Sequence, residues 1–326
     1  MTLAIVILNW NGKKLLEQFL PSVVRYSPEG QLYIVDNAST DDSLDFVRTH
    51  FPEIHIVENP TNSGYAGGYN RALQHIKADV YCLLNSDVLV TEGWLSPILC
   101  TFEEERIAVV QPKIKDEKCP THFEYAGAAG GFIDRYGFPY CRGRVFETIE
   151  EDKGQYNESF PVPIFWASGA CFFIRAEVFH QLGGFDEDFF AHQEEIDLCW
   201  RVHHLGKQVV YCSESTVYHV GGATLTAANP KKTYLNFRNS LFMLLKNLPA
   251  KGLYTTIFLR MVLDGIAGVR FLLQGKPRFT WEVIRAHFHF YKRFFFFKKK
   301  RPSKLITNYY QVKSIVWEYF VLGVRG

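Results

Sequence analysis

Regular cysteine spacing and long apolar runs are both missing from this chain of 326 residues. Its seven cysteines are scattered and form no C-x-x-C pair, which disfavours a zinc site or a disulfide framework and favours reduced thiols in the cytosol. A membrane-spanning helix needs about 18 consecutive apolar residues, and the best candidate, residues 253–273, is interrupted by Arg260, Asp264 and Arg270. The first residues lack the basic start and the apolar length of a secretory signal.

Negative charge is scarce towards the C-terminus. Residues 276–326, here called the basic tail, carry 12 Lys/Arg against 2 Asp/Glu, whereas residues 1–275 carry 24 against 32. Basic and aromatic side chains alternate in residues 285–301, with a basic run at residues 298–301, and this composition suits an anionic membrane surface. A helix packed on the body with a solvated lysine patch is the structural alternative. Nucleic acid is a poorer partner because the acidic body offers no extended basic face.

Apolar runs alternate with helical patterns in the first third of the chain. We expect strands at residues 3–8, 31–36, 54–57, 79–84 and 107–111, with helices at residues 13–26, 41–51, 67–76 and 94–105. This alternation predicts a parallel sheet covered by helices on both faces. Ligands bind beyond the carboxyl ends of such strands, where this sequence has Asn9, Asp36, Asn85 and Asp87. Turn chemistry alone explains any one of these residues, but all of them together favour a polar binding site.

The rest of the chain has a different pattern. Residues 123–144 are rich in glycine, aromatics and arginine and predict hairpins or loops. Further on we expect strands at residues 170–174 and 208–212, helices at 175–182 and 193–205, and helix from residue 231 to the end.

Two groups of residues suggest metal and acid–base chemistry. Asp87, in the Asn-Ser-Asp turn 85–87, suits a hard divalent cation such as Mg²⁺ or Mn²⁺. His219, at a predicted strand end before two glycines, could complete that site, although a lone histidine is more often structural.

Three carboxylates crowd the start of the helix at residues 193–205. The helix dipole alone would explain Glu194, Glu195 and Asp197 at this end. Like charges this close also raise the pKa of at least one member, as a general base near neutral pH requires. Asp197 is expected to pair with Arg201 four residues later, which leaves Glu194 and Glu195 as candidate bases.

Several motifs in fixed order resemble glycosyltransferase family 2, especially its bacterial rhamnosyltransferase-like members. They occupy residues 7–12, 35–41, 62–71, 85–87, 166–170, 183–187 and 194–198. The resemblance implies an α/β fold of GT-A type, with a nucleotide-binding, parallel-rich sheet flanked by helices and a helical C-terminal extension. It divides the chain into a catalytic domain (1–225, with a nucleotide-sugar half 1–111 and an acceptor half 112–225) and a basic-aromatic extension (226–326). A dehydrogenase is disfavoured because no G-x-G-x-x-G follows the first strand.

The resemblance also implies a reaction and its partners. A sugar would pass with inversion from a dTDP, UDP or GDP donor to a hydroxyl of a glycan or polyprenyl-linked glycan, in cell-surface polysaccharide synthesis. Such an enzyme would be cytoplasmic and peripheral on the inner face of the cell membrane. The competing hypothesis is a non-catalytic protein on a decayed glycosyltransferase fold, which binds a nucleotide sugar or a membrane surface.

Residue roles follow from the same resemblance. Glu195 matches the catalytic carboxylate, usually Asp, and Asp87 with His219 matches the metal ligands, while Asn85 replaces the first Asp of a D-x-D motif. The implied nucleotide-sugar contacts are Asn9, Asp36, Asn62, Gly64, Arg71, Asn85 and Ser86. The implied acceptor-side residues are Trp166, Gly169, Glu194 and Asp197.

Overall fold

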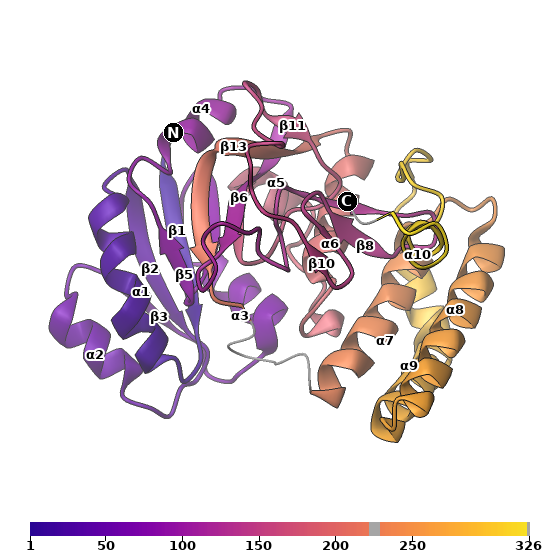
Figure 1. Ribbon diagram of the computed structural model, residues 1–326. Helices are drawn as coiled ribbons and strands as arrows, with labels where there is room; N and C mark the ends of the chain where they lie inside the picture. Colours follow the sequence, from indigo (N-terminus) through magenta and orange to yellow (C-terminus); the bar gives the residue numbers. More distant parts are fainter. Residues whose placement is uncertain (222–228, 325–326) are drawn as a thin grey trace.

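A mixed nine-stranded sheet forms the centre of the structure, a computed structural model that describes residues 1–221 and 229–324 (Figure 1). The strand order is β11-β13-β6-β12-β4-β1-β2-β3, and β5 pairs with β13. The strands of this sheet are β1 (Leu3–Asn9), β2 (Gly30–Asp36), β3 (His55–Glu58), β4 (Val80–Asn85), β5 (Val88–Val90), β6 (Ile107–Asp116), β11 (Val162–Pro163), β12 (Cys171–Arg175) and β13 (Gln208–His219). A second, four-stranded sheet contains β7 (Gly131–Ile133), β8 (Pro139–Cys141), β9 (Arg144–Val145) and β10 (Thr148–Ile149).

The direction of β12 departs from the all-parallel expectation. Strands β1 to β4 are parallel neighbours, but β12 runs antiparallel between β4 and β6. A parallel neighbour needs a crossover connection, usually a helix, whereas β12 follows a long stretch of loops and short strands and enters the sheet from the opposite end. The sheet is therefore parallel-rich, as the resemblance implies, and mixed rather than purely parallel.

Helices cover both faces of the sheet. The helices are α1 (Lys13–Tyr26), α2 (Ser43–His50), α3 (Gly64–Leu73), α4 (Ser96–Thr101), α5 (Ala176–Gln181), the 3₁₀ turn η1 (Glu187–Phe189), α6 (Glu194–His204), α7 (Pro230–Asn247), α8 (Leu253–Leu273), α9 (Pro277–Lys299) and α10 (Ile315–Phe320). Side chains alternate along β1, so that Ile5 packs in the same core as Leu16 of α1, while Val6 packs in the core that contains Trp200 of α6.

Three predicted helices differ from those observed. The predicted helix 67–76 begins earlier, at Gly64, and the predicted helix 94–105 is shortened to Ser96–Thr101. The expectation of continuous helix to the end is wrong between residues 301 and 314. Pro302 disfavours helical conformation in the residue before it, so α9 ends at Lys299. The predicted domain boundary at 225/226 lies outside the described residues.

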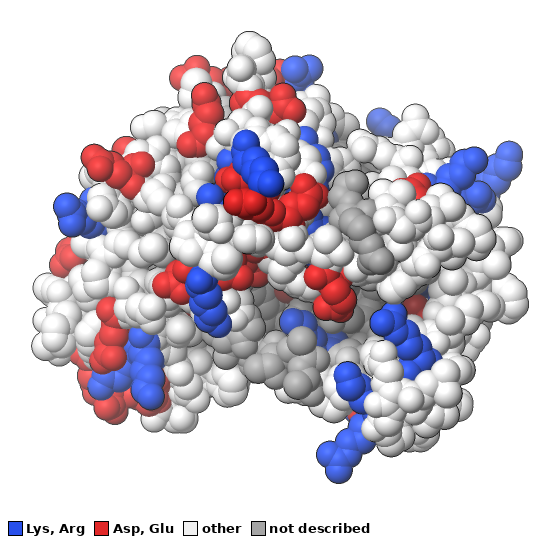
Figure 2. Space-filling model, in the orientation of Figure 1, with Lys and Arg blue, Asp and Glu red and all other residues white. Residues whose placement is uncertain are grey.

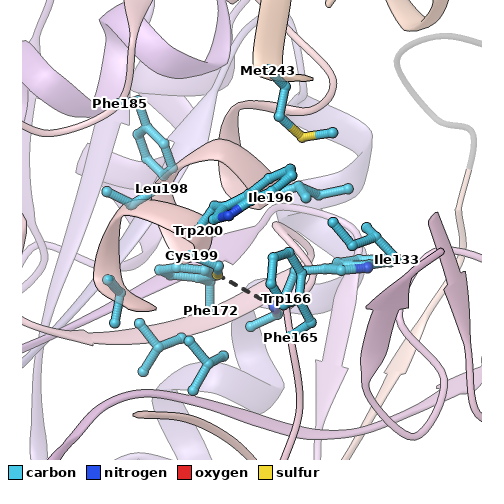
Figure 3. Close-up of a cluster of buried hydrophobic side chains, with 14 of the residues drawn as sticks. Ile133, Phe165, Trp166, Phe172, Phe185, Ile196, Leu198, Cys199, Trp200 and Met243 are labelled. Carbon is cyan, nitrogen blue, oxygen red and sulfur yellow. Dashed lines mark hydrogen bonds between the residues drawn. The ribbon is translucent and has the colours of Figure 1, made fainter. Parts of the chain in front are cut away.

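Helix α6 is fixed from both sides by buried side chains (Figure 3). Trp200 is fully buried and packs edge-on against Phe165, with ring centroids 5.3 Å apart. The Ala167 N–H donates to Cys199 Sγ at 3.5 Å, and Met243 of α7 belongs to the same cluster. Burial of this many large apolar groups leaves α6 little freedom to shift, so the position of its N-terminus is well defined.

The C-terminal helices lie on the side of the molecule away from α1 and α2 (Figure 1). Helix α9 packs on α7, where the rings of Phe242 and Phe297 stack with centroids 3.7 Å apart. Helices α8 and α9 form an antiparallel pair, here called the α8–α9 hairpin, as the outer layer. Within the part of the chain that the structure describes, no helix is long and apolar enough to cross a membrane.

Candidate active site

The predicted polar residues meet at one edge of the sheet. Asn9 lies opposite Asp36 in the β1–β2 pair, and Asn85 lies opposite Leu8 in the β1–β4 pair. Asn9 is fully buried, and its Nδ2 donates to Asp36 Oδ1 at 3.1 Å and to Ser43 Oγ at 2.9 Å. This placement makes Asn9 a support that orients the Asp36 carboxylate towards the strand ends.

The turn before α3 connects the sheet edge that carries Asn9 and Asp36 to the segment before α6. Asn62 Oδ1 accepts from Asn37 Nδ2 at 3.0 Å and from the Gly64 N–H at 2.9 Å. Gly64 has φ +74°, and a Cβ there would lie 2.5 Å from the Phe190 carbonyl oxygen, so only glycine fits. Arg71, in the last turn of α3, donates from Nη1 to Thr61 Oγ1 at 3.2 Å. Asn37 is 2% exposed and was missed in the sequence, where it looks like a turn residue.

Asp87 and His219 are brought together by the pairing of β5 with β13. His219 lies opposite Val88, and the distance from its Nε2 to Asp87 Oδ1 is 3.1 Å. On the other side of the ring, Nδ1 lies 3.4 Å from Glu124 Oε1. Burial opposes a charge on His219, but the hydrogen bond to Asp87 and the nearby carboxylate of Glu124 raise its pKa to about 10. Sequence reasoning missed Glu124, which stands in a loop-like segment without any motif.

The Asp87–His219 pair fits a divalent cation. A carboxylate oxygen and an imidazole nitrogen both suit Mn²⁺, and their separation of 3.1 Å is close to the edge of an octahedron with ligands at about 2.1 Å, which is about 3 Å. The carboxylate of Glu124 on Nδ1 is the partner that ligating histidines ordinarily have, and it leaves Nε2 for the metal. Among residues 1–221 and 229–324, no cluster of three or more His, Cys, Asp or Glu is arranged to hold a metal by protein side chains alone.

Asn85 and Ser86 lie directly beside this pair. Asn85 Nδ2 is 3.4 Å from His219 Nε2, and the Asn85 N–H donates to the Ala170 carbonyl at 3.0 Å. Both side chains are partly exposed, whereas Asp87 is 5% exposed. The turn therefore presents an amide and a hydroxyl to solvent next to the carboxylate.

Glu194 and Glu195, the first two residues of α6, are unlike ordinary surface carboxylates. Burial raises the pKa of Glu195 to about 7, although backbone N–H groups at the start of the helix oppose this. Burial and the neighbouring Glu195 raise the pKa of Glu194 well above its usual range. The Oε2 atom of each has no hydrogen-bond partner among the described residues. Two buried carboxylate oxygens without partners are costly for folding alone, and they favour a functional role.

Asp197 has a different environment from its neighbours on α6. Its carboxylate pairs with Arg201 Nε and with Lys246 Nζ, both at 2.9 Å, and accepts from Asn247 Nδ2 at 2.8 Å. Burial alone would raise the pKa of Asp197, but Lys246 and Arg201 lower it to about 2. The predicted Asp197–Arg201 pair is confirmed. Asp197 thus ties α6 to α7, and its assignment to the acceptor side stays a prediction.

The segment before α6 is held in a strained conformation. Phe190, His192 and Gln193 all have positive φ, between 66° and 75°, which costs energy in residues other than glycine. Asn239 of α7, fully buried, holds this segment: its Nδ2 lies within 3.0 Å of the carbonyl oxygens of Phe189, Ala191 and His192. Strain sustained by so specific a contact is typical of functional sites, and here it sets the position of Glu194 and Glu195.

The two other predicted acceptor-side residues, Trp166 and Gly169, contact different parts of the fold. Trp166 is 3% exposed, belongs to the cluster in Figure 3 and donates from Nε1 to the Phe132 carbonyl at 2.9 Å. The Gly169 carbonyl accepts from the Tyr65 hydroxyl at 2.9 Å. Burial, with Tyr69, Glu194 and Glu195 as further causes, raises the pKa of Tyr65 well above its usual range. Tyr65 therefore connects Gly169 to α3, whereas Trp166 packs in the core that also contains Ile196 of α6.

These features match one family in both sequence and structure. The family model "Glycosyl transferase family 2" matches residues 4–183. The chain belongs to glycosyl transferase family 2. The family assignment and the α/β fold of GT-A type that the motifs implied are thus confirmed.

Two curated relatives are glycosyltransferases that have low sequence identity to this chain over most of their length. The chain is 23% identical to the low-salt glycan biosynthesis hexosyltransferase Agl10 of Haloferax volcanii, over 88% of this chain and 90% of the relative. It is 25% identical to the N-acetylglucosaminyl-diphospho-decaprenol L-rhamnosyltransferase of Mycobacterium tuberculosis, over 72% of this chain and 83% of the relative.

Solved glycosyltransferase structures share the fold. GalNAc-T7 with UDP, GalNAc and Mn²⁺ superimposes with a TM-score of 0.60 at 16% identity, over 77% of this chain and 48% of that one. The mannosyltransferase PcManGT from Pyrobaculum calidifontis, with GDP-Man and Mn²⁺, gives a TM-score of 0.54 at 14% identity, over 87% and 85%.

Proposed function

We propose that this family 2 glycosyltransferase is metal-dependent and inverting, and that it moves a sugar from a dTDP, UDP or GDP donor to a hydroxyl of a glycan or polyprenyl-linked glycan. Cell-surface polysaccharide synthesis is the process that such an acceptor suits. The observation that carries the proposal is Glu195, a carboxylate with a pKa of about 7 and an unpartnered oxygen at the fixed start of α6. A base of this pKa is half deprotonated near neutral pH and can still take a proton effectively.

Each group of residues has one task in the reaction. Asp36 and the Asn62–Gly64 turn hold the nucleoside, with Asn85, Ser86 and Arg71 towards the diphosphate. Asp87 and His219 would hold the divalent cation, which neutralises charge on the departing diphosphate. Glu195 accepts the proton of the acceptor hydroxyl while that oxygen bonds to the anomeric carbon from the face opposite the diphosphate. The bond to the diphosphate oxygen breaks with its electron pair, and the anomeric configuration inverts.

The relatives support the donor and acceptor classes. The two solved structures contain Mn²⁺ together with UDP and GalNAc in one case and GDP-Man in the other. The mycobacterial relative is named for an acceptor linked through a diphosphate to decaprenol. We extend these classes to this chain, and we propose that it works on the inner face of the cell membrane, where residues 285–301 attract anionic lipid.

The alternative of a non-catalytic protein on a decayed site is less consistent with this geometry. A protein without catalytic function gains nothing from two buried, unpartnered carboxylate oxygens or from the strained backbone of Phe190, His192 and Gln193. Replacement of these features by apolar or paired groups would stabilise the fold.

A donor panel tests the function directly. We expect the purified full-length chain to release nucleoside diphosphate from one nucleotide class, faster with Mn²⁺ or Mg²⁺ and with a polyprenyl-diphosphate-linked sugar, and not in excess EDTA. Proton NMR of the product should show the anomeric configuration opposite to that of the donor. Binding of a nucleotide sugar without any release would favour the non-catalytic alternative, and a retained configuration would exclude the inverting reaction.

Glu124→Gln should weaken metal binding without removing a ligand. Because the carboxylate orients and polarises the His219 ring from Nδ1, we expect Mn²⁺ affinity to fall about 10- to 100-fold, measured by titration in the presence of nucleoside diphosphate. Glu151→Gln, which removes a half-exposed carboxylate paired with Lys153, is the matched control. Equal Mn²⁺ affinity in both variants would show that Glu124 has only a structural role.

A further inference from the structure

Helix α8 has its charges turned inward and its apolar side chains turned outward. Arg260 and Asp264 are 4% and 0% exposed, and they pair through Nε and Oδ1 at 2.8 Å. Arg260 also donates to the Gly137 carbonyl at 3.1 Å, so this pair is part of the contact with the body. The outward side consists of large apolar side chains that are 45–64% exposed: Tyr254, Phe258, Val262, Ile266, Val269 and Leu272. A helix next to water has the reverse arrangement, so this face is built to lie against an apolar phase.

Helix α9 continues this surface with aromatic side chains and adds positive charge. Its exposed aromatic residues recur at helical spacing and are 60–75% exposed: Trp281, Phe288, Tyr291 and Phe295. Next to them, basic residues recur every seven positions: Arg285, Lys292 and Lys299. Tryptophan and tyrosine beside Lys and Arg are the residues that populate the boundary between lipid headgroups and acyl chains.

The hairpin lacks negative charge at its surface. Residues 253–299 contain only two acidic residues, Asp264, which is fully buried, and Glu282, whose side chain is 14% exposed and pairs with Arg285 at 3.0 Å. In the face shown in Figure 2, the side where the hairpin lies is mostly white and blue, while red side chains gather over the rest of the molecule. The surface is therefore both apolar and positive.

We propose that the α8–α9 hairpin docks on an anionic phospholipid bilayer, with the outward side of α8 and the aromatic residues of α9 inserted at the headgroup–acyl boundary. Charge selects lipid over a second copy of the chain, because a symmetric pair of hairpins would oppose two basic surfaces without exposed carboxylates to neutralise them. The inference rests on the membrane contact in the proposed function but not on the transfer reaction. In this proposal, burial of apolar side chains, and not ionic attraction by residues 285–301 alone, holds the protein on the bilayer.

The structure also revises which basic residues face the lipid. Of the run at residues 298–301, Lys300 pairs with Asp186 and Asp188, each at 2.6 Å, and Arg301 donates to the Leu248 carbonyl at 2.6 Å. Both are directed at the body, so only Lys298 and Lys299 remain for anionic headgroups. Phe297 is likewise fully buried on α7 and does not contribute to docking.

These inward contacts give the docked hairpin a fixed relation to the active site. Arg293 of α9 pairs with Asp188 at 2.7 Å, and Asp186 is shared between Lys300 and Lys246 of α7. Asp186 caps η1 and Asp188 lies within it, and this turn leads into the strained segment before Glu194. A bilayer under the hairpin would therefore hold the start of α6 in one orientation relative to a lipid-linked acceptor.

Vesicle sedimentation of the full-length chain tests the proposal. We expect binding to phosphatidylglycerol/phosphatidylcholine vesicles that high salt weakens but does not abolish. The double variant Phe258→Ser/Ile266→Ser should lower the partition coefficient at least about tenfold at either salt concentration, since each side chain loses its apolar burial. Phe160→Ser, which removes an 81% exposed aromatic side chain outside the hairpin, is the matched control and should bind as the wild type does. Lys298→Ser/Lys299→Ser should weaken only the salt-sensitive part of binding, to which Arg285 and Lys292 also contribute.

The other outcomes would overturn docking by the hairpin. No binding to these vesicles, or equal partition of the wild type and Phe258→Ser/Ile266→Ser, would show that the apolar face does not enter lipid. A concentration-dependent dimer that the same double variant abolishes, without vesicle binding, would assign the face to a protein interface. Donor turnover in solution is measured in a separate assay. A failure of the transferase proposal can therefore be distinguished from a failure of the docking proposal.

Discussion

Glu195→Gln is expected to lower turnover by about 10² to 10⁴-fold while the donor still binds, because the amide keeps the shape of the side chain but cannot take a proton. The carboxylate has the environment of a base: burial raises its pKa to about 7, and its Oε2 has no partner in the described chain. Turnover and KM should be measured with the donor and metal identified in the panel, and donor affinity by calorimetry. If Glu195→Gln binds the donor as the wild type does but has lost turnover, Glu195 acts in the chemical step and not in donor binding.

The pH profile provides a second readout for the same residue. Below a pH of about 7 Glu195 is increasingly protonated and cannot accept the acceptor proton, so kcat/KM of the wild type should rise with pH and level off above that value. The residual activity of Glu195→Gln should lack this rise. Glu194→Gln is the matched neighbour, and a larger loss there with near-normal Glu195→Gln would move the base to Glu194.

Asp87→Ala is expected to remove metal-stimulated transfer, with a loss of about 10² to 10³-fold. The cation supplies several kcal/mol of charge stabilisation to the departing diphosphate, and each tenfold in rate corresponds to about 1.4 kcal/mol. The variant should no longer respond to added Mn²⁺, in parallel with wild type in EDTA. Measurement of rate against Mn²⁺ concentration separates weaker metal binding, which excess metal restores, from complete loss.

Two further variants distinguish loss of the metal response from a folding defect. Asp87→Asn keeps the size of the side chain and a hydrogen bond to His219 Nε2, so it isolates the loss of charge. Glu92→Ala removes an exposed acidic residue just beyond β5 and should leave the metal response unchanged. Full metal-stimulated activity in both Asp87 variants, with thermal unfolding like that of the wild type, would remove Asp87 from the metal site.

The sequence was sufficient where local pattern determines structure. Apolar runs that end in Asn or Asp predicted β1, β2 and β4 with their polar ends, and register confirms that Asn9 and Asp36 are neighbours. The Asp197–Arg201 pair also follows from helical spacing alone. Side-chain direction within a strand or helix depends on few residues, so these parts of the site could be placed from the sequence.

Other parts depend on contacts between distant segments and were not predictable. Glu124 meets His219 from a segment without periodicity, and Asn239 holds the carbonyls before α6 from the middle of α7. In the sequence, the charged residues within α8 only interrupt an apolar run. Residue spacing alone does not show that Arg260 and Asp264 face the body. Tertiary packing decides which side of a helix is the inside, and here it inverts the usual arrangement.

The attachment of α7 limits how this chain could be recombined with others. Lys246 and Asn247, near the end of α7, supply two of the three partners of the fully buried Asp197 carboxylate, and Asn239 fixes the approach to Glu194. A chimera that exchanged everything after residue 229 would leave Asp197 with Arg201 alone and release the strained segment. An exchange of the lipid-facing hairpin should therefore begin after Leu248, and the new anchor would have to supply again the pairs that Arg293 and Lys300 make with Asp186 and Asp188.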